Sequence, residues 1–239
     1  MNRWAEDLLT MTTGEPVDRE PEVFEKIEIA ARALGFEHCA YGLQLPLPLT
    51  NPKVLTVNNY ASAWRERYAE AGYLAIDPTV MHGRRTTAPL IWSDCVFSGA
   101  RELWADARSH GLRVGWAQSC LDSYGIGGML TLARSSEPLT RSELESNEIK
   151  MMWLASIAHL SLSRLLKNQR QGEDVVELTQ RETEVLKWHA DGKTMSEISE
   201  ILIISVDTVK FHTKNAVTKL RAANKTAAVV RAALLGLLC

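Results

Sequence analysis

The last sixty or so residues constrain the fold of this chain more than any other segment. Thr179 is followed three positions later by Glu182, and Thr194 is followed in the same way by Glu197. This spacing is typical of a capping box, in which a hydroxyl and a carboxylate satisfy the free backbone amides of a first helical turn. Ser205 marks a third helix start. Three short helices separated by tight turns predict an all-α helix-turn-helix domain at this end of the chain.

The third of these helices has two different faces. Small and apolar side chains recur at three- and four-residue spacing and predict a buried stripe of Val206, Val209, Thr213, Ala216, Val217 and Leu220. Asp207, Lys210, Lys214 and Thr218 fall on another face. Lysines there can donate to guanine in a major groove or contact phosphates. Surface lysines are often only solvated, but within a capped three-helix array this edge favours DNA contact.

The charge distribution separates the two ends of the chain. Residues 179–239 carry nine basic and six acidic side chains, a net charge of +3, whereas residues 1–165 carry a net charge of −4. A bulk nucleic-acid packaging protein would be far more basic throughout. A small basic domain attached to an acidic one is typical of a specific regulator.

The length of 239 residues suggests two domains. The segment KNQRQGEDVVE is polar, contains one glycine and has no apolar periodicity, so it reads as a linker. We therefore expect an N-terminal domain at 1–166, a linker at 167–177 and the helix-turn-helix domain at 178–239.

Several protein classes are disfavoured by the sequence. It has no run of about eighteen apolar residues, so we expect no transmembrane helix and no membrane partner. The start, MNRWAEDLLTM, is acidic where a secretion signal is basic. The four cysteines are single and widely spaced, without a CxxC pair, so neither a metal site nor a disulfide framework is expected. These features predict a cytoplasmic protein without a cofactor.

The N-terminal part alternates between helical and strand-like patterns. Helices are expected at about 21–35, 60–72 and 98–110 and from a capping box at Thr140 to about Leu166, and strands at 38–44, 53–58, 114–121 and 126–134. This order predicts an α+β fold, in which an α/β/α sandwich on an antiparallel sheet precedes the all-α domain. The apolar stripe of the last helix is broader than one packing face needs, so part of it is a candidate dimer interface.

Three aromatic residues and one aspartate stand out in NYASAWRERYAEAGYLAIDPTV. Tyr60, Trp64 and Tyr68 are spaced four apart, which predicts one helix face carrying two phenols and an indole N–H. Asp77 precedes Pro78 and is placed to cap the next helix. From the residues alone, a core aromatic stripe and an ordinary helix cap explain this pattern better than a ligand site does.

A resemblance to a known family changes this interpretation. The chain resembles the LuxR family of acyl-homoserine-lactone receptors along nearly its whole length. The N-terminal similarity runs through NYASAWRERY, GYLAIDPTV, HGLRVG and GGMLTLAR. The C-terminal similarity runs through LTQRETEVLKWHADGKT, EISEIL, TVKFHTKNAVTKL and NKTAAV. The resemblance implies that a ligand lies between the sheet and a helical layer.

The resemblance also assigns roles at the polar head of the ligand. It implies that Trp64 donates its indole N–H to the lactone carbonyl and that Asp77 accepts the amide N–H. Tyr60 would donate to the acyl carbonyl, with Thr131 as a second donor where relatives often have serine. One buried acceptor and several donors in an apolar pocket match the groups that such a lactone offers.

The remaining ligand contacts implied by the resemblance are apolar. Trp92 would lie against the lactone ring and Tyr68 beside the acyl chain. The residues that either line the tail pocket or belong to the ordinary core are Ala40, Gly42, Leu103, Ala107, Leu112 and Ala117. Gly115 would admit close backbone packing.

At the DNA end, the resemblance implies base reading by Lys210 and Lys214 and phosphate contacts by Lys193 and Thr194. Many relatives have asparagine at the position of Lys210, which leaves the preferred operator open. The implied partners are an acyl-homoserine lactone, a second copy of the chain in a homodimer, and double-stranded DNA with an inverted repeat. RNA polymerase is a possible further partner.

Two other functions stay open at the level of sequence. One is an enzyme that degrades a small molecule and carries an accessory DNA-binding domain, but no Ser/His/Asp, Cys/His or metal constellation supports it. The other is an orphan regulator, or one that answers a different signal. The acyl length, the substituent at the 3-position and the choice between activation and repression are not encoded in any pattern we recognise.

Overall fold

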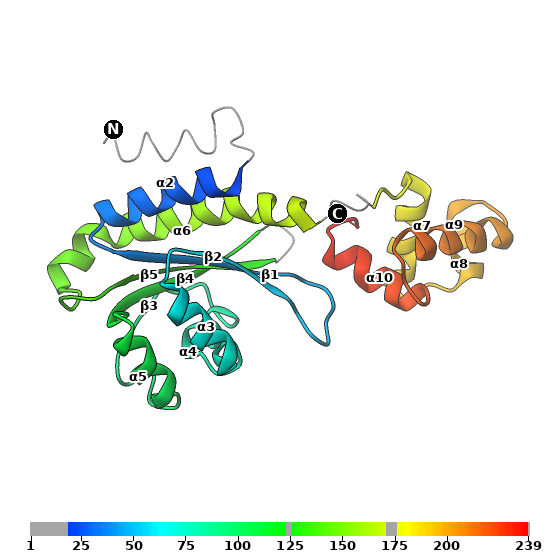
Figure 1. Cartoon of the computed structure of the whole chain (residues 1–239). Coiled ribbons are helices and arrows are strands. Elements are labelled where there is room, and N and C mark those ends of the chain that lie inside the picture. The colour runs from blue at the N-terminus through cyan, green and yellow to red at the C-terminus, as the bar shows by residue number, and fades with distance from the viewer. Residues whose placement is uncertain (1–18, 123–125, 171–175, 239) are drawn as a thin grey trace. The chain divides into compact units, whose positions relative to one another are not determined.

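The computed structural model describes residues 19–122, 126–170 and 176–238. The chain divides into two compact units, an α/β unit and a helical unit (Figure 1). Within the described ranges, no helix is both long and apolar enough to cross a membrane.

The α/β unit is built on one five-stranded sheet with the order β2-β1-β5-β4-β3, in which every neighbouring pair is antiparallel. The strands are β1 (His38–Gln44), β2 (Val54–Asn58), β3 (Leu90–Ile91), β4 (Val114–Leu121) and β5 (Gly127–Arg134). Four of them agree with the predicted strands to within one residue at each end. The two-residue β3 was not predicted, because it is too short for alternation to be visible.

Helices cover both faces of the sheet (Figure 1). One face carries α2 (Glu20–Ala33) and α6 (Arg141–Arg170). The other carries α3 (Ser62–Glu70), the 3-10 turn η1 (Tyr73–Ala75), α4 (Pro78–Gly83) and α5 (Arg101–Ser109). The predicted α/β/α sandwich on an antiparallel sheet is therefore confirmed.

The two faces of the sheet differ in side-chain size. Cys39, Tyr41 and Leu43 alternate along β1 into the large apolar core that includes residues of α2 and α6. Because successive strand residues point to opposite faces, Ala40 lies on the face of α3, α4 and α5. Ala40 is opposite Thr131, which is opposite Ala117 in the next strand. Small side chains therefore occupy the middle of this second face.

Helix α6 ends later than the sequence predicted. It begins after Thr140, whose hydroxyl accepts a hydrogen bond from the Glu143 amide at 3.2 Å, and it continues to Arg170 instead of ending near Leu166. The reason is that no glycine or proline interrupts the sequence before Gly172. The first four residues assigned to the linker are thus helical, and its residues 171–175 lie outside the described ranges.

The helical unit contains α7 (Gln180–Ala190), α8 (Met195–Leu202), α9 (Val206–Lys219) and α10 (Lys225–Leu234). Both predicted capping boxes are present: the Thr179 and Thr194 hydroxyls accept from the Glu182 and Glu197 amides at 3.3 Å. The return bonds from the two threonine amides to these carboxylates are 2.8 Å long. Ser205 caps α9 as predicted, by accepting from the Thr208 amide at 3.1 Å. The predicted helix-turn-helix order is confirmed.

The fourth helix of this unit was missed. Asn224 caps α10 by accepting a hydrogen bond from the Ala227 amide at 2.9 Å, and an asparagine before a helix-forming run is a start signal that the sequence does contain. Ala228 and Ala232 of α10 pack into a shared core with Leu186 and Leu220. Helix α10 therefore completes the core of the helix-turn-helix unit.

Candidate functional site

The aromatic residues predicted to bind ligand gather in one cluster of the α/β unit. Trp64 is buried at 5 % exposure, and Tyr60, Tyr68 and Trp92 pack against the same cluster. Trp64 and Tyr68 are neighbours on α3, with ring centroids 5.6 Å apart in an edge-on arrangement. Tyr60 differs from the prediction, because α3 begins at Ser62 and not at residue 60. Tyr60 thus reaches the cluster from the segment before the helix.

Asp77 is held in one orientation by three hydrogen bonds. It caps α4, with its Oδ1 accepting from the Thr79 amide at 2.8 Å and from the Thr79 hydroxyl at 2.6 Å. Its Oδ2 accepts from the Tyr68 hydroxyl at 2.9 Å. The side chain is buried, and hydrogen bonds to an ionised acceptor are stronger than neutral ones. Sequence reasoning predicted the cap but missed Thr79 and the bond from Tyr68.

The two phenols beside Asp77 remain protonated donors. Burial raises the pKa of Tyr60 and of Tyr68 well above the ordinary range, and the negative charge of Asp77 raises both further. The pKa of Tyr68 is also raised by its hydrogen bond to Asp77. A phenol that stays neutral can donate to a carbonyl, which is the chemistry expected of Tyr60.

Trp92 is fixed by an unusually close backbone. Its amide donates to the Gly115 carbonyl at 2.8 Å, and a Cβ at Gly115 would collide with the Trp92 indole. Phe97 and Trp104 pack edge-on against the indole at centroid distances of 5.8 and 6.1 Å. The buried Nε1 of Trp92 has no hydrogen-bond partner among the residues that the structure describes. A buried N–H is costly to leave unpaired, so Trp92 Nε1 is a candidate donor to a ligand.

Thr131 lies on the same face of the sheet as the aromatic cluster. It is buried in the middle of β5, in the cross-strand row with Ala40 and Ala117. Three of the residues suggested for the tail pocket belong to the core cluster around Trp64, namely Leu103, Ala107 and Leu112.

A clasp of charged side chains connects α3, η1 and α5. The Arg67 Nε donates to Asp106 Oδ2 at 2.5 Å, and the Tyr73 hydroxyl donates to the same oxygen at 2.6 Å. Hydrogen bonds from Tyr73 and Arg67 lower the pKa of Asp106. The Tyr73 ring in turn packs on Trp64 with centroids 6.2 Å apart. Sequence reasoning did not identify this clasp, because its members are far apart in the chain.

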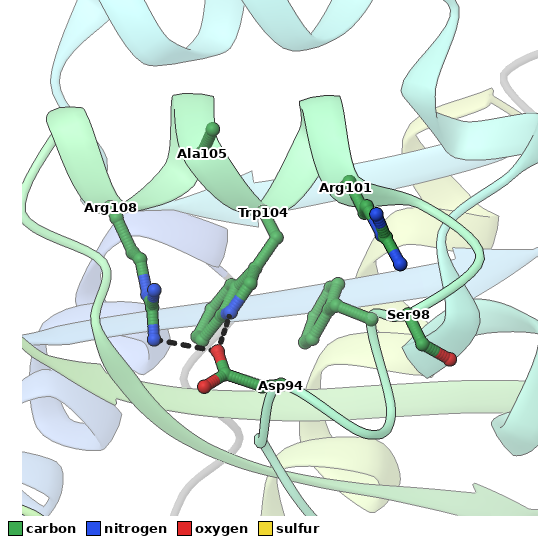
Figure 2. A pocket seen from close by; sticks show the side chains of 7 residues that line it. Asp94, Ser98, Arg101, Trp104, Ala105 and Arg108 are labelled. Carbon is green, nitrogen blue, oxygen red and sulfur yellow. Dashed lines mark hydrogen bonds and ion pairs between the residues drawn. The ribbon is translucent and has the colours of Figure 1, made fainter.

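A surface recess of about 350 Å³ lies beside α5 (Figure 2) and is lined by Asp94, Phe97, Ser98, Arg101, Trp104, Ala105 and Arg108. None of the residues predicted to bind ligand lines it. Asp94 already accepts hydrogen bonds from the Trp104 indole and the Arg108 guanidinium, each at 2.7 Å. Phe97 stacks on Trp104 with centroids 4.5 Å apart. Phe97 and Trp104 also pack edge-on against Trp92, so the wall of the recess supports the Trp92 indole.

The helical unit presents the predicted basic edge. Asp207, Lys210, Lys214 and Thr218 are all exposed on α9. The predicted apolar stripe faces inward except at Val206, which is half-buried and belongs to neither apolar cluster of the unit. Lys210 Nζ lies 3.0 Å from Asp207 Oδ1, and Lys214 has no ion pair within the described part of this unit.

The two residues predicted to contact phosphates, Lys193 and Thr194, lie at the start of α8. Lys193 Nζ is 3.7 Å from Glu197 Oε1, and the Thr194 hydroxyl is engaged in the helix cap. Helices α7 and α9 are joined by an ion pair between the exposed Lys219 Nζ and the buried Glu182 Oε2 at 2.7 Å. Burial alone would raise the pKa of Glu182, but Lys219 and the Thr179 amide lower it overall.

Comparison with known proteins decides the family. Residues 19–162 match the family described as autoinducer binding domain, and residues 176–232 match that of bacterial regulatory proteins of the luxR family. The chain is also 42 % identical over 240 residues to the transcriptional activator protein AnoR of Acinetobacter nosocomialis, with all of both chains covered. The chain belongs to the LuxR family. It thus combines the autoinducer-binding and LuxR-type DNA-binding domains of that family's quorum-sensing regulators.

Solved structures of LuxR-family proteins have the same fold. A structure of SdiA in complex with octanoyl-rac-glycerol matches with a TM-score of 0.85 and 35 % identity, covering 99 % of this chain and 95 % of SdiA. The N-acylhomoserine lactone dependent factor CepR2 of Burkholderia cenocepacia matches with a TM-score of 0.63 and 32 % identity, covering 69 % of this chain and 95 % of CepR2.

Proposed function

We propose that this LuxR-family regulator binds an acyl-homoserine lactone in its N-terminal domain and, as a homodimer, binds double-stranded DNA with an inverted repeat. The domains in this proposal are 1–166 and 178–239, joined by a linker at 167–177. In this role the chain is a cytoplasmic regulator and not an enzyme. RNA polymerase is the partner through which bound protein would act on transcription.

The observation that carries the ligand assignment is the environment of Asp77. A buried carboxylate oriented by Thr79 and Tyr68 lies among aromatic side chains, so it can accept one more N–H from a ligand. In the proposed complex Asp77 accepts the amide N–H, Trp64 donates to the lactone carbonyl, and Tyr60 donates to the acyl carbonyl.

Three further residues complete the proposed pocket. Thr131 is a second donor beside the acyl carbonyl, and its buried position in the row of small residues supports this role. Trp92 lies against the lactone ring, and its unpaired Nε1 supports a polar ligand group nearby. The ring of Tyr68 flanks the start of the acyl chain while its hydroxyl stays on Asp77.

A second ligand class is favoured by one observation. The related SdiA structure contains octanoyl-rac-glycerol, which has an acyl chain but no amide N–H. A different acyl signal is therefore the alternative for this chain. Both classes offer Asp77 a donor, either a glycerol hydroxyl or an amide N–H. They differ in the groups around that donor, because only the lactone presents it together with two carbonyls in fixed geometry.

The test compares an acyl-homoserine lactone with the matched ester in which oxygen replaces the amide N–H. We expect the ester to bind roughly tenfold or more weakly, because it leaves the Asp77 carboxylate without that donor. Asp77→Asn should reduce this difference, since the asparagine is uncharged. Equal binding of amide and ester by the unaltered protein would contradict the assignment of Asp77, and tighter binding of a monoacylglycerol would favour the alternative.

The dimer is supported by apolar side chains on the outer side of α6. Ile149 is 81 % exposed, Leu160 63 % and Met152 38 %, although all three lie on a helix whose other side is core. Exposed apolar groups at helical spacing are typical of a helix that packs on a partner. Sedimentation of the ligand-bound protein tests this part, with Ile149→Lys expected to yield monomer.

A further inference from the structure

Phe211 is the most unusual side chain on the exposed face of α9. Its exposed fraction is 60 %, whereas the apolar residues Val209 and Ala216 of the same helix are buried. It belongs to neither apolar cluster of the helical unit. Its ring contact within the described residues is His212, the next residue, at a centroid distance of 5.5 Å.

The position of Phe211 on the helix wheel explains this exposure. With about 3.6 residues per turn, Phe211 lies close to the direction of Asp207, Lys214 and Thr218, all of which are exposed. The buried Val209 and Ala216 lie on the opposite side. Phe211 therefore projects directly away from the core of the domain, in the middle of the surface that α9 offers to a partner.

Folding does not require a phenyl group there. A largely exposed aromatic side chain gains little from burial in the free protein, so its contribution must come from a surface that covers it. The neighbouring lysines show what kind of surface that is, because Lys210 and Lys214 are exposed beside Phe211 on the same face of α9. An apolar group next to two cations suits a partner that is anionic overall and carries isolated apolar groups.

The major groove of DNA has this chemistry. Its phosphates are anionic, and the one apolar group on any base-pair edge is the 5-methyl group of thymine. Side chains in the first turns of a recognition helix contact these edges, and Phe211 lies in the first half of α9. We propose that Phe211 packs on thymine methyl groups and makes each operator half-site require a 5-methylpyrimidine beside the base pairs that the lysines contact. This inference rests on the proposed DNA binding by α9.

The experiment begins with the full-length, ligand-loaded protein and a pool of random duplexes, from which a preferred site is selected. Each thymine of that site is then replaced in turn by uracil, which removes the methyl group and leaves the hydrogen-bonding edge unchanged. Affinity is measured at one fixed salt concentration for the unaltered protein and for Phe211→Ala and Phe211→Leu.

We expect at least one symmetric pair of thymines at which uracil weakens binding about fourfold per half-site, as expected for one buried methyl group. In Phe211→Ala the uracil and thymine duplexes should bind equally. Phe211→Leu keeps an apolar contact and should retain most of the sensitivity to the methyl group. A melting temperature unchanged in both variants would show that the effect is not loss of folding.

Three results would overturn the inference. One is sequence-specific binding that is insensitive to uracil at every thymine, and another is an equal uracil penalty in Phe211→Ala. In both, lysine-dependent DNA binding would persist, so the proposed function would stand and the ring would instead face a protein. Failure of the ligand-loaded protein to select any sequence would overturn the proposed function as well. If the alanine variant fails to fold, the uracil series on the unaltered protein and on Phe211→Leu still tests whether binding depends on a thymine methyl group.

Discussion

Asp77 shows how one side chain serves both the fold and the proposed ligand site. Its Oδ1 is committed to capping α4 through Thr79, whereas Oδ2 accepts from Tyr68 and keeps further acceptor capacity. The capping function alone would be satisfied by asparagine, which is also a good N-cap residue. A ligand N–H would instead use the second carboxylate oxygen, which asparagine replaces with a donor NH2 group.

Asp77→Asn should therefore separate ligand binding from stability. We expect ligand affinity to fall by roughly ten- to a hundredfold, equivalent to about 1.5–3 kcal/mol for a hydrogen bond to a charged group. The melting temperature without ligand should change little, because the cap persists. Titration calorimetry measures the first quantity and a thermal melt the second. Glu25→Gln, which neutralises an exposed carboxylate of α2 on the other face of the sheet, is the matched control and should bind normally.

At the scale of elements, α9 is tied to α7 by polar contacts as well as by core packing. His189 of α7 lies 3.1 Å from the Thr213 hydroxyl of α9 through Nε2, and the Glu182–Lys219 ion pair joins the same two helices. Burial lowers the pKa of His189 below its ordinary value, with a contribution from the positive charge of Lys225. The imidazole is therefore neutral in the folded unit.

This pKa shift predicts the pH dependence of the helical unit. The unfolded chain binds a proton at His189 near pH 6.5, whereas the folded chain binds it only at lower pH. The free energy of unfolding should consequently decrease as the pH falls below about 6.5. Denaturant titrations at pH 8 and pH 5.5 measure the decrease, and His189→Gln should lessen it. An unchanged pH dependence in this variant would mean that other groups cause it.

The exposed edge of α9 should be dispensable for ligand binding. Lys210→Ala combined with Lys214→Ala removes two cations without touching the α/β unit, so we expect DNA affinity to fall at least tenfold and the salt dependence to become less steep. Ligand affinity should stay unchanged. Loss of ligand binding in this double variant would contradict the division of function between the two domains. Lys187→Ala, on α7, is a control for net charge.

The elements that sequence reasoning predicted well are those with local signals. The caps at Thr179, Thr194 and Ser205 depend on residues three positions apart, and they are present as predicted. The misses depend on distant partners or on short length. The bond from Tyr68 to Asp77 and the clasp around Asp106 require tertiary packing, and the start of α3 after Tyr60 has no side-chain cap to announce it. Asn224 is the exception, since its local signal was overlooked.

At the scale of the whole molecule, the proposed ligand has an energetic role. The aromatic region contains the buried Asp77 carboxylate and the Trp92 indole N–H, which has no partner among the described residues. A ligand that satisfies both should stabilise the folded state by mass action, by roughly 2.7 kcal/mol at a hundred times its Kd. The melting temperature should accordingly rise with ligand concentration. A melt unchanged by a ligand shown to be bound would contradict this coupling.

The central claim is that an acyl-homoserine lactone controls DNA binding by this LuxR-family chain. The most direct measurement purifies the protein with and without lactones of different tail length and oxidation, then measures its binding to an inverted-repeat duplex at one fixed salt concentration. We expect binding to appear or tighten with one class of lactone. If protein that retains no lactone binds the duplex equally tightly, the central claim is contradicted. The chain would then be a regulator whose pocket does not control DNA binding.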